Sequence, residues 1–264
     1  MNRITQKFQE LRRRKKKAFI GFLTAGDPSL QVTEQLVLSF EKVGVDIIEL
    51  GVPFSDPLAD GKTIQAASER ALAQHVTLDK ILQLVKRLRA HSQIPIALMT
   101  YYNPIFHFGE EKFISNAQEA GVDGIIIPDL PPEEASVLIR ASRAKKIATI
   151  FFLSPTTDKE RIKRIATASR GFIYYVSMTG VTGTAQMIFT DEIKKQIELA
   201  RKLTQKPICV GFGVSTLSDI RAILEIADGV IVGSAIIKEI VRHKGKKNIV
   251  RNVSRFVGQL AKVV

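Results

Sequence analysis

The sequence predicts an α/β protein, a (β/α)8 TIM barrel with an extra N-terminal helix. Short apolar runs alternate with longer amphipathic segments, and eight such runs occur without a reversal of the order. This alternation is typical of parallel strands joined by crossover helices, and eight repeats favour a closed barrel over an open sheet. The expected strands are Ala18–Leu23, Asp46–Leu50, Ile96–Thr100, Gly124–Ile127, Ala148–Leu153, Phe172–Val176, Pro207–Gly211 and Gly229–Val232.

Helical spacing of apolar residues marks the segments between these strands. The clearest repeats lie in Gln31–Val43, Leu78–Leu88 and Asp219–Ala227. Ahead of the first strand, Ile4, Phe8 and Leu11 form a stripe that we expect to cover the lower end of the barrel. After the eighth strand, an amphipathic segment that includes Val253 and Val257 predicts a closing helix.

Capping residues agree with these boundaries. Asp158, Thr190 and Ser215 each precede a predicted helix and offer a side-chain oxygen to its first turn. Gly44 and Gly121 follow helices in the position that favours a left-handed backbone. The chain has no long linker rich in Pro, Gly or Ser, so we expect residues 1–264 to form a single (β/α)8 barrel domain.

Composition narrows the class of protein further. The chain has 264 residues, of which 45% are hydrophobic and 25% charged, as in globular proteins with a sizeable core. No apolar run approaches the ~20 residues of a membrane span. The first residues lack the apolar core of a secretory signal, so the expected location is cytoplasmic. Cys209 lies in an apolar segment and is expected to be a packed core thiol.

The net charge of +13 raises nucleic-acid binding as an alternative. The densest basic block, residues 12–17, has no interleaved aromatic residues of the kind that stack on bases. We therefore expect a solvated basic rim and no nucleic-acid partner. The four histidines, His75, His91, His107 and His243, lack ligand spacing, so no metal site is expected.

A carboxylate within the second expected strand is the first chemical signal. Alternation along that strand places Glu49 on the face opposite Ile48 and Leu50. If those two residues meet the helices, Glu49 points into the barrel mouth, where desolvation would raise its pKa and suit it to proton transfer. The alternative is a structural ion pair with an Arg or Lys.

A proline-stiffened acidic loop follows, over residues 52–61, and it contains Asp56 and Asp60. Two carboxylates in different environments, such as Glu49 and Asp60, are what acid–base chemistry needs. Asp60 could equally be a turn or cap residue beside Gly61.

Glycine turns follow the last three expected strands. They contain Gly180 and Gly183, then Gly211 and Gly213, and finally Gly233 with Ser234 at the start of a helix. Barrel enzymes commonly bind phosphate with the loops after strands seven and eight and a helix N-terminus. The alternative is that these glycines serve turn geometry alone.

The run from Glu49 to Gly61, followed by Thr63-Ile64-Gln65, resembles the signature of the tryptophan synthase α subunit family. Supporting motifs are Leu23-Thr24-Ala25-Gly26-Asp27-Pro28, Tyr101-Tyr102-Asn103-Pro104, Gly180-Val181-Thr182-Gly183 and Gly211-Phe212-Gly213, and the resemblance extends over essentially the whole chain. It implies reversible retro-aldol cleavage of indole-3-glycerol phosphate to indole and glyceraldehyde 3-phosphate. The indole then passes to a β subunit, which is expected as the partner in an α2β2 heterotetramer.

The resemblance also implies roles for individual residues. Glu49 would be the proton-transfer residue, and Asp60 would hold the indole N–H. Other implied residues contact the substrate: Phe22, Tyr102 and Phe212 surround the indole, and Tyr174 supports the site. The phosphate would lie against Gly183, Gly211, Gly213, Gly233 and Ser234. Thr182 would lie in a loop that closes over the bound substrate. No cofactor is expected in this chain, because the pyridoxal phosphate of the family's second reaction belongs to the β subunit.

Lys62, Met178 and the high net charge depart from the pattern expected of this family. They motivate an alternative, a catalytically weak barrel that acts mainly as binding partner and activator of the β subunit. Another phosphosugar barrel enzyme, such as a pentose phosphate epimerase or an aldose–ketose isomerase, fits the fold alone. The acidic loop motif argues against it.

Overall fold

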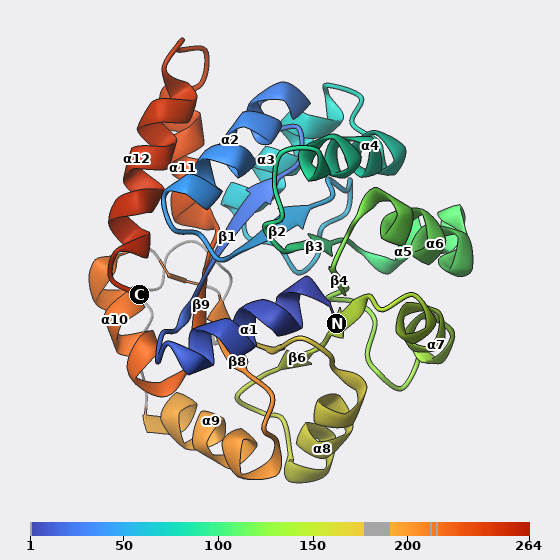
Figure 1. The fold of residues 1–264 in the computed structure, drawn as a ribbon. Helices are drawn as coiled ribbons and strands as arrows, with labels where there is room; N and C mark the ends of the chain where they lie inside the picture. The colour runs from blue at the N-terminus through green and yellow to red at the C-terminus, as the bar shows by residue number, and fades with distance from the viewer. Residues whose placement is uncertain (1, 177–190, 212, 215) are drawn as a thin grey trace.

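The structure, a computed structural model, describes residues 2–176, 191–211, 213, 214 and 216–264 (Figure 1). One parallel sheet contains the strands β1 (Ala18–Thr24), β2 (Ile47–Gly51), β3 (Ile96–Met99), β4 (Gly124–Ile126), β5 (Ala148–Ile150), β6 (Phe152–Leu153), β7 (Ile173–Val176), β8 (Ile208–Gly211) and β9 (Gly229–Val232). Helices surround these strands. They are α1 (Arg3–Arg13), α2 (Leu30–Lys42), α3 (Lys62–Leu72), α4 (Leu78–Arg89), α5 (Tyr102–Phe108), α6 (Glu110–Ala120), α7 (Ser136–Ala144), α8 (Lys159–Ala168), α9 (Asp191–Leu203), α10 (Leu217–Ile226), α11 (Ser234–His243) and α12 (Ile249–Ala261).

The strand order shows how the barrel closes. It runs β5-β4-β3-β2-β1-β9-β8-β7-β6, so β5 and β6 are the two ends of the hydrogen-bonded sheet. Phe151 alone separates them in the chain. The predicted strand Ala148–Leu153 is thus interrupted at Phe151: its first part pairs with β4 and its second part with β7. The other seven predicted strands are each confirmed to within one residue at either end. The predicted barrel fold is also confirmed.

The N-terminal helix α1 lies across the centre of the ring of helices and strands in Figure 1. Ile4 is fully buried, and its side chain fills the space beside Gly124 and Gly171. Phe8 packs against Phe172, with ring centroids 5.7 Å apart. The expected cover over the lower end of the barrel is confirmed.

Three aspartates fasten neighbouring strands at this lower end. Each directly precedes a strand and accepts a backbone N–H from the first or second residue of a strand beside it: Asp46 from Phe19, Asp123 from Ile96 and Asp228 from Ile208, each at 2.9 Å. Asp123 also bonds Arg3 and Arg89 at 3.0 and 2.9 Å. These side chains hold the strand ends in register away from the functional face.

Most of the capping predictions are confirmed. The Asp158 carboxylate accepts the Arg161 N–H at 2.8 Å, and Gly121 is left-handed with φ of 93°. For α10 the predicted cap, Ser215, is wrong: Thr216 caps this helix, because its hydroxyl accepts the Asp219 N–H while Asp219 accepts the Thr216 N–H. Thr190 lies outside the described residues.

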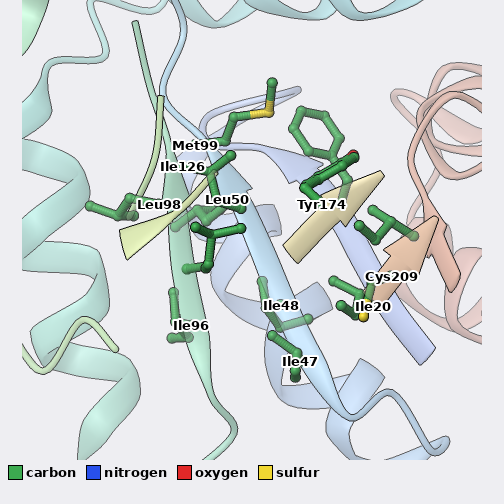
Figure 2. Close-up of a cluster of buried hydrophobic side chains, with 14 of the residues drawn as sticks. Ile20, Ile47, Ile48, Leu50, Ile96, Leu98, Met99, Ile126, Tyr174 and Cys209 are labelled. Atoms are coloured by element: carbon green, nitrogen blue, oxygen red, sulfur yellow. The ribbon is translucent and has the colours of Figure 1, made fainter. Parts of the chain in front are cut away.

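The strand register decides which side chains face the barrel interior. Phe22 pairs with Glu49, and Glu49 with Ala97, so these residues share one face of the sheet. Figure 2 shows Met99 and Tyr174 at one end of the buried cluster, with Ile20, Ile47 and Cys209 toward the other. Cys209 is fully buried, as expected. Met99, the last residue of β3, and Tyr174 thus lie toward the end of the barrel where the strands finish.

Candidate active site

Glu49 lies in the middle of β2, and its side chain faces the barrel interior as predicted from alternation. The residue is 1% exposed, and neither carboxylate oxygen has a hydrogen-bond partner among the residues that the structure describes. The predicted alternative, a structural ion pair, is not found within that part of the chain. Burial, together with the nearby charge of Asp60, raises the pKa of Glu49 to about 8. The side chain is therefore mostly protonated at neutral pH.

Asp60 lies in the loop between β2 and α3, directly before the helix cap Gly61. The side chain of Gln65, in the first turn of α3, donates to the Asp60 carbonyl at 2.8 Å and fixes this turn. Burial raises the pKa of Asp60 to about 6, against the effect of a hydrogen bond from Tyr101. Asp60 is therefore mostly ionised at neutral pH, while Glu49 is not.

A cavity opens at this end of the barrel, with a volume of about 240 Å³ including its mouth. Strands β1 to β3 and helix α3 contribute its walls. The lining residues are Phe22, Thr24, Gly51, Val52, Asp60, Ile64, Ser68, Met99 and Tyr101. Phe22 lies on the wall of this cavity, which combines apolar side chains with the Asp60 carboxylate.

Tyr101, rather than the predicted Tyr102, lines the cavity. Its hydroxyl accepts the Ala59 N–H at 2.9 Å, and its ring stacks on Phe54 with centroids 5.2 Å apart. Tyr102 begins α5, and its ring packs against Phe106 at 5.9 Å. Alternation could have found the difference, because Tyr101 has the same parity as the inward-facing Ala97 and Met99.

Tyr174 projects into the interior from β7 and is 4% exposed. Its ring lies 4.8 Å from that of Phe152. Burial and the charge of Glu49 hold the pKa of the Tyr174 phenol well above its usual range. Tyr174 is therefore a neutral phenol close to Glu49 and Asp60.

The glycine turns lie at the same end of the barrel. Gly211 ends β8, Gly213 is left-handed with φ of 74°, and Gly233 is the cap of α11, which begins at Ser234. Helix N-termini present unpaired backbone N–H groups and favour anions. Thr182, Gly183, Phe212 and Met178 lie outside the described residues, so their predicted roles stay predictions.

Two further expectations concern metals and membranes. Among the described residues, no group of three or more His, Cys, Asp or Glu side chains could hold a metal ion. Within the same part of the chain, no helix has the length and apolar character needed to cross a membrane.

Lys62, which departs from the expected pattern, is exposed at the first position of α3.

These features define a (β/α)8 barrel enzyme that pairs a protonated with an ionised carboxylate beside an apolar cavity. Comparison with known proteins gives the family. The family model described as tryptophan synthase alpha chain matches residues 8–264. The tryptophan synthase alpha chain of Geotalea daltonii is 50% identical over 247 residues, 94% of this chain and 93% of the relative. That of Geobacter sulfurreducens is 46% identical over 264 residues, 100% of this chain and 99% of the relative.

Solved structures agree. Tryptophan synthase subunit alpha from Legionella pneumophila superposes with a TM-score of 0.92 at 37% identity, covering 100% of this chain and 98% of that one. Aminoacrylate-bound tryptophan synthase from M. tuberculosis contains a chain with a TM-score of 0.89 at 31% identity, covering 100% of both chains. The chain belongs to the tryptophan synthase alpha chain family. The lyase class expected from the sequence is confirmed with it.

Proposed function

We propose that Glu49 and Asp60 catalyse the retro-aldol cleavage of indole-3-glycerol phosphate to indole and glyceraldehyde 3-phosphate. The observation that supports these roles is the separation of the two carboxyl pKa values, about 8 for Glu49 and about 6 for Asp60, within one barrel mouth. Near pH 7 one group can donate a proton while the other bears a charge.

The reaction needs a proton on carbon 3 of the indole ring. Protonated Glu49 supplies it, and the ring nitrogen then carries positive charge, which the Asp60 carboxylate stabilises through the N–H. Glu49, now ionised, removes the proton from the glycerol hydroxyl next to the ring. The carbon–carbon bond breaks, its electrons return to the ring, and the aldehyde leaves. Atoms balance, and Glu49 is again protonated.

The apolar wall suits the indole ring and the glycine turns suit the phosphate. Phe22 and Tyr101 line the cavity, and Tyr174 lies in the barrel interior beside β8. Gly211, Gly213, Gly233 and Ser234 would present backbone N–H groups to the phosphate, at the N-terminus of α11. The same proposal gives Thr182, Gly183 and Phe212 their expected roles in the closing loop, the phosphate site and the indole pocket, respectively.

The partner is a tryptophan synthase β subunit in an α2β2 assembly. Two large apolar side chains stand exposed after the strands that line the cavity: Leu58, in the loop between β2 and α3, is 94% exposed, and Phe106, in α5, is 68% exposed. Such side chains are typical of an interface. We assign no cofactor to the cleavage step, since an acid, a charge and an apolar pocket suffice for it, and place pyridoxal phosphate in the β subunit. A cytoplasmic location stays a prediction.

Indole release tests the proposal. The chain is incubated with indole-3-glycerol phosphate alone and then with a β subunit, without serine, and compared with Glu49→Gln and Asp60→Asn. We expect release that rises with the β subunit and is lost in both variants. Near-normal release in either variant would remove its residue from the mechanism. A folded wild-type chain that releases no indole but still stimulates the β subunit would establish the weak-barrel alternative.

A further inference from the structure

Thr24 ends β1 with a hydroxyl whose position the fold does not explain. The residue is 2% exposed, and its Oγ1 atom has no hydrogen-bond partner among the described residues. A buried hydroxyl without a partner is destabilising, so such groups are nearly always satisfied by protein or by ordered water. Thr24 lines the same cavity as Asp60, so this cavity lies next to the unpartnered hydroxyl.

Ser68 brings a second hydroxyl to this cavity. It lies in α3 and is 4% exposed. The helix begins two residues after Asp60, and the bond from Gln65 to the Asp60 carbonyl joins the two. Ser68 and the Asp60 carboxylate are thus carried by one locally stiffened segment, with Thr24 facing them from β1.

A buried water needs two to four polar partners in a polar site. Thr24, Ser68 and Asp60 provide three polar lining residues, and the hydroxyl of a fourth, Tyr101, already bonds Ala59 and Asp60. We propose that Thr24 and Ser68 bind one ordered water that donates a hydrogen bond to the Asp60 carboxylate. This makes both residues positioning residues for Asp60, and the inference rests on the proposed role of Asp60 in the cleavage reaction.

The water would act on the ionisation of Asp60. A hydrogen bond donated to the charged form of a carboxyl lowers its pKa, whereas burial raises it. The other titratable groups that bear on Asp60 are Glu49, Tyr101 and Tyr174. Removal of the water should therefore favour protonated Asp60 and move the acidic limb of the pH–activity profile to higher pH. The basic limb, which reports the ionisation of Glu49, should not move.

The test measures kcat and KM for indole release between pH 5 and 9. Thr24→Val replaces the hydroxyl with a methyl group of similar size, and Ser68→Ala removes the second hydroxyl. In each variant we expect the midpoint of the acidic limb of kcat/KM to move to higher pH by roughly one unit. At pH 6 this corresponds to a loss of about three- to tenfold. Thr24→Ser should restore the wild-type profile.

The combined variant Thr24→Val/Ser68→Ala tests whether the two hydroxyls share one water. A shared water predicts that the double variant loses no more than the larger single variant, whereas independent contacts give multiplied losses. Ser169→Ala is the matched control, since its hydroxyl is also buried without a partner among the residues that the structure describes, but it lies at the opposite end of the barrel. Its profile should match that of the wild type.

Unshifted acidic limbs in both folded single variants, or multiplied losses in the double variant, overturn the shared water. Thr24→Val in an Asp60→Asn background distinguishes the role of Thr24 from that of Asp60. If the residual rate falls further there, Thr24 acts on something other than Asp60. If Asp60→Asn itself keeps full activity, the proposed function of Asp60 fails instead. Circular dichroism and thermal unfolding of each variant establish that it is folded.

Discussion

Gly211 leaves the space that the Tyr174 side chain occupies. A Cβ atom at position 211 would lie 2.4 Å from the Tyr174 hydroxyl and 2.7 to 2.8 Å from its ring. The two residues come from neighbouring strands, β8 and β7. The absence of a side chain at position 211 is therefore required for the packing of Tyr174, in addition to any contact of Gly211 with phosphate.

Gly211→Ala should displace Tyr174 and with it the interior of the site. We expect kcat/KM for indole release to fall roughly tenfold to a hundredfold, since small displacements in an active site are costly. Adding Tyr174→Phe removes the nearest clashing atom and should recover part of the loss. Steady-state kinetics on the two single variants and the double variant measure the coupling. Strictly multiplied losses would show that the two positions act independently.

The pH profile of the wild-type chain should be bell-shaped. Activity needs ionised Asp60, whose pKa is about 6, and protonated Glu49, whose pKa is about 8. The rate should therefore fall below about pH 6 and above about pH 8. Initial rates of indole release at constant ionic strength give both limbs. A profile that keeps rising through pH 9 would contradict the role of Glu49 as the proton donor.

Glu49→Gln should abolish turnover and raise stability. The rate should drop roughly 10²- to 10⁴-fold, as is typical for loss of a positioned acid or base. Folding raises the pKa of Glu49 from 4.5 to about 8, so the folded state holds its proton more tightly than the unfolded state. Wild-type stability therefore falls as pH rises from about 4.5 to about 8, and the glutamine variant escapes this loss.

The stability advantage of Glu49→Gln should thus be small near pH 4.5 and approach roughly 3–5 kcal/mol above about pH 8. Urea unfolding at pH 5, 7 and 9 measures it. Glu160→Gln is the control, because Glu160 is an exposed partner of Lys163. An advantage for Glu49→Gln that is equal at all three pH values would mean that burial of the carboxyl is not its cause.

Tyr101→Phe and Tyr102→Phe form a matched pair of adjacent substitutions. The first removes the acceptor of the Ala59 N–H and the hydrogen bond to Asp60. We expect it to lower kcat about tenfold and to raise the acidic limb of the pH profile, because the charged form of Asp60 loses a donor. The Tyr102 variant should keep kcat within about twofold and leave the acidic limb where it is in the wild type, because that ring packs against Phe106 outside the cavity. Equal losses would return the pocket role to Tyr102.

Asp123→Ala should destabilise the barrel without touching the catalytic site. It removes the acceptor of the Ile96 N–H and leaves Arg89, which is only 11% exposed, without its carboxylate. Loss of one partner of a buried pair typically costs about 3–5 kcal/mol. Glu160→Ala, at an exposed pair, should cost below about 1 kcal/mol. Chemical unfolding of both variants provides the comparison.

The sequence by itself determined the architecture and the orientation of Glu49. Short apolar runs and apolar repeats with a period of 3.6 depend on local geometry, so the runs mark strands such as Gly229–Val232 correctly. Alternation along β2 is equally local. It places Glu49 on the face opposite Ile48 and Leu50, so Glu49 faces the interior when those two side chains face the helices. The family resemblance rests on the motif from Glu49 to Gly61 and needed no coordinates.

Only the tertiary structure decided which side chains share the cavity. Tyr101 and Tyr102 are adjacent, and the start of α5 between them sends one ring to Asp60 and the other to Phe106. Thr24 and Ser68 come from different elements 44 positions apart, so no local pattern unites them. The pKa of Glu49 depends on burial by the whole barrel. Such properties arise from packing between distant segments, which sequence periodicity does not encode.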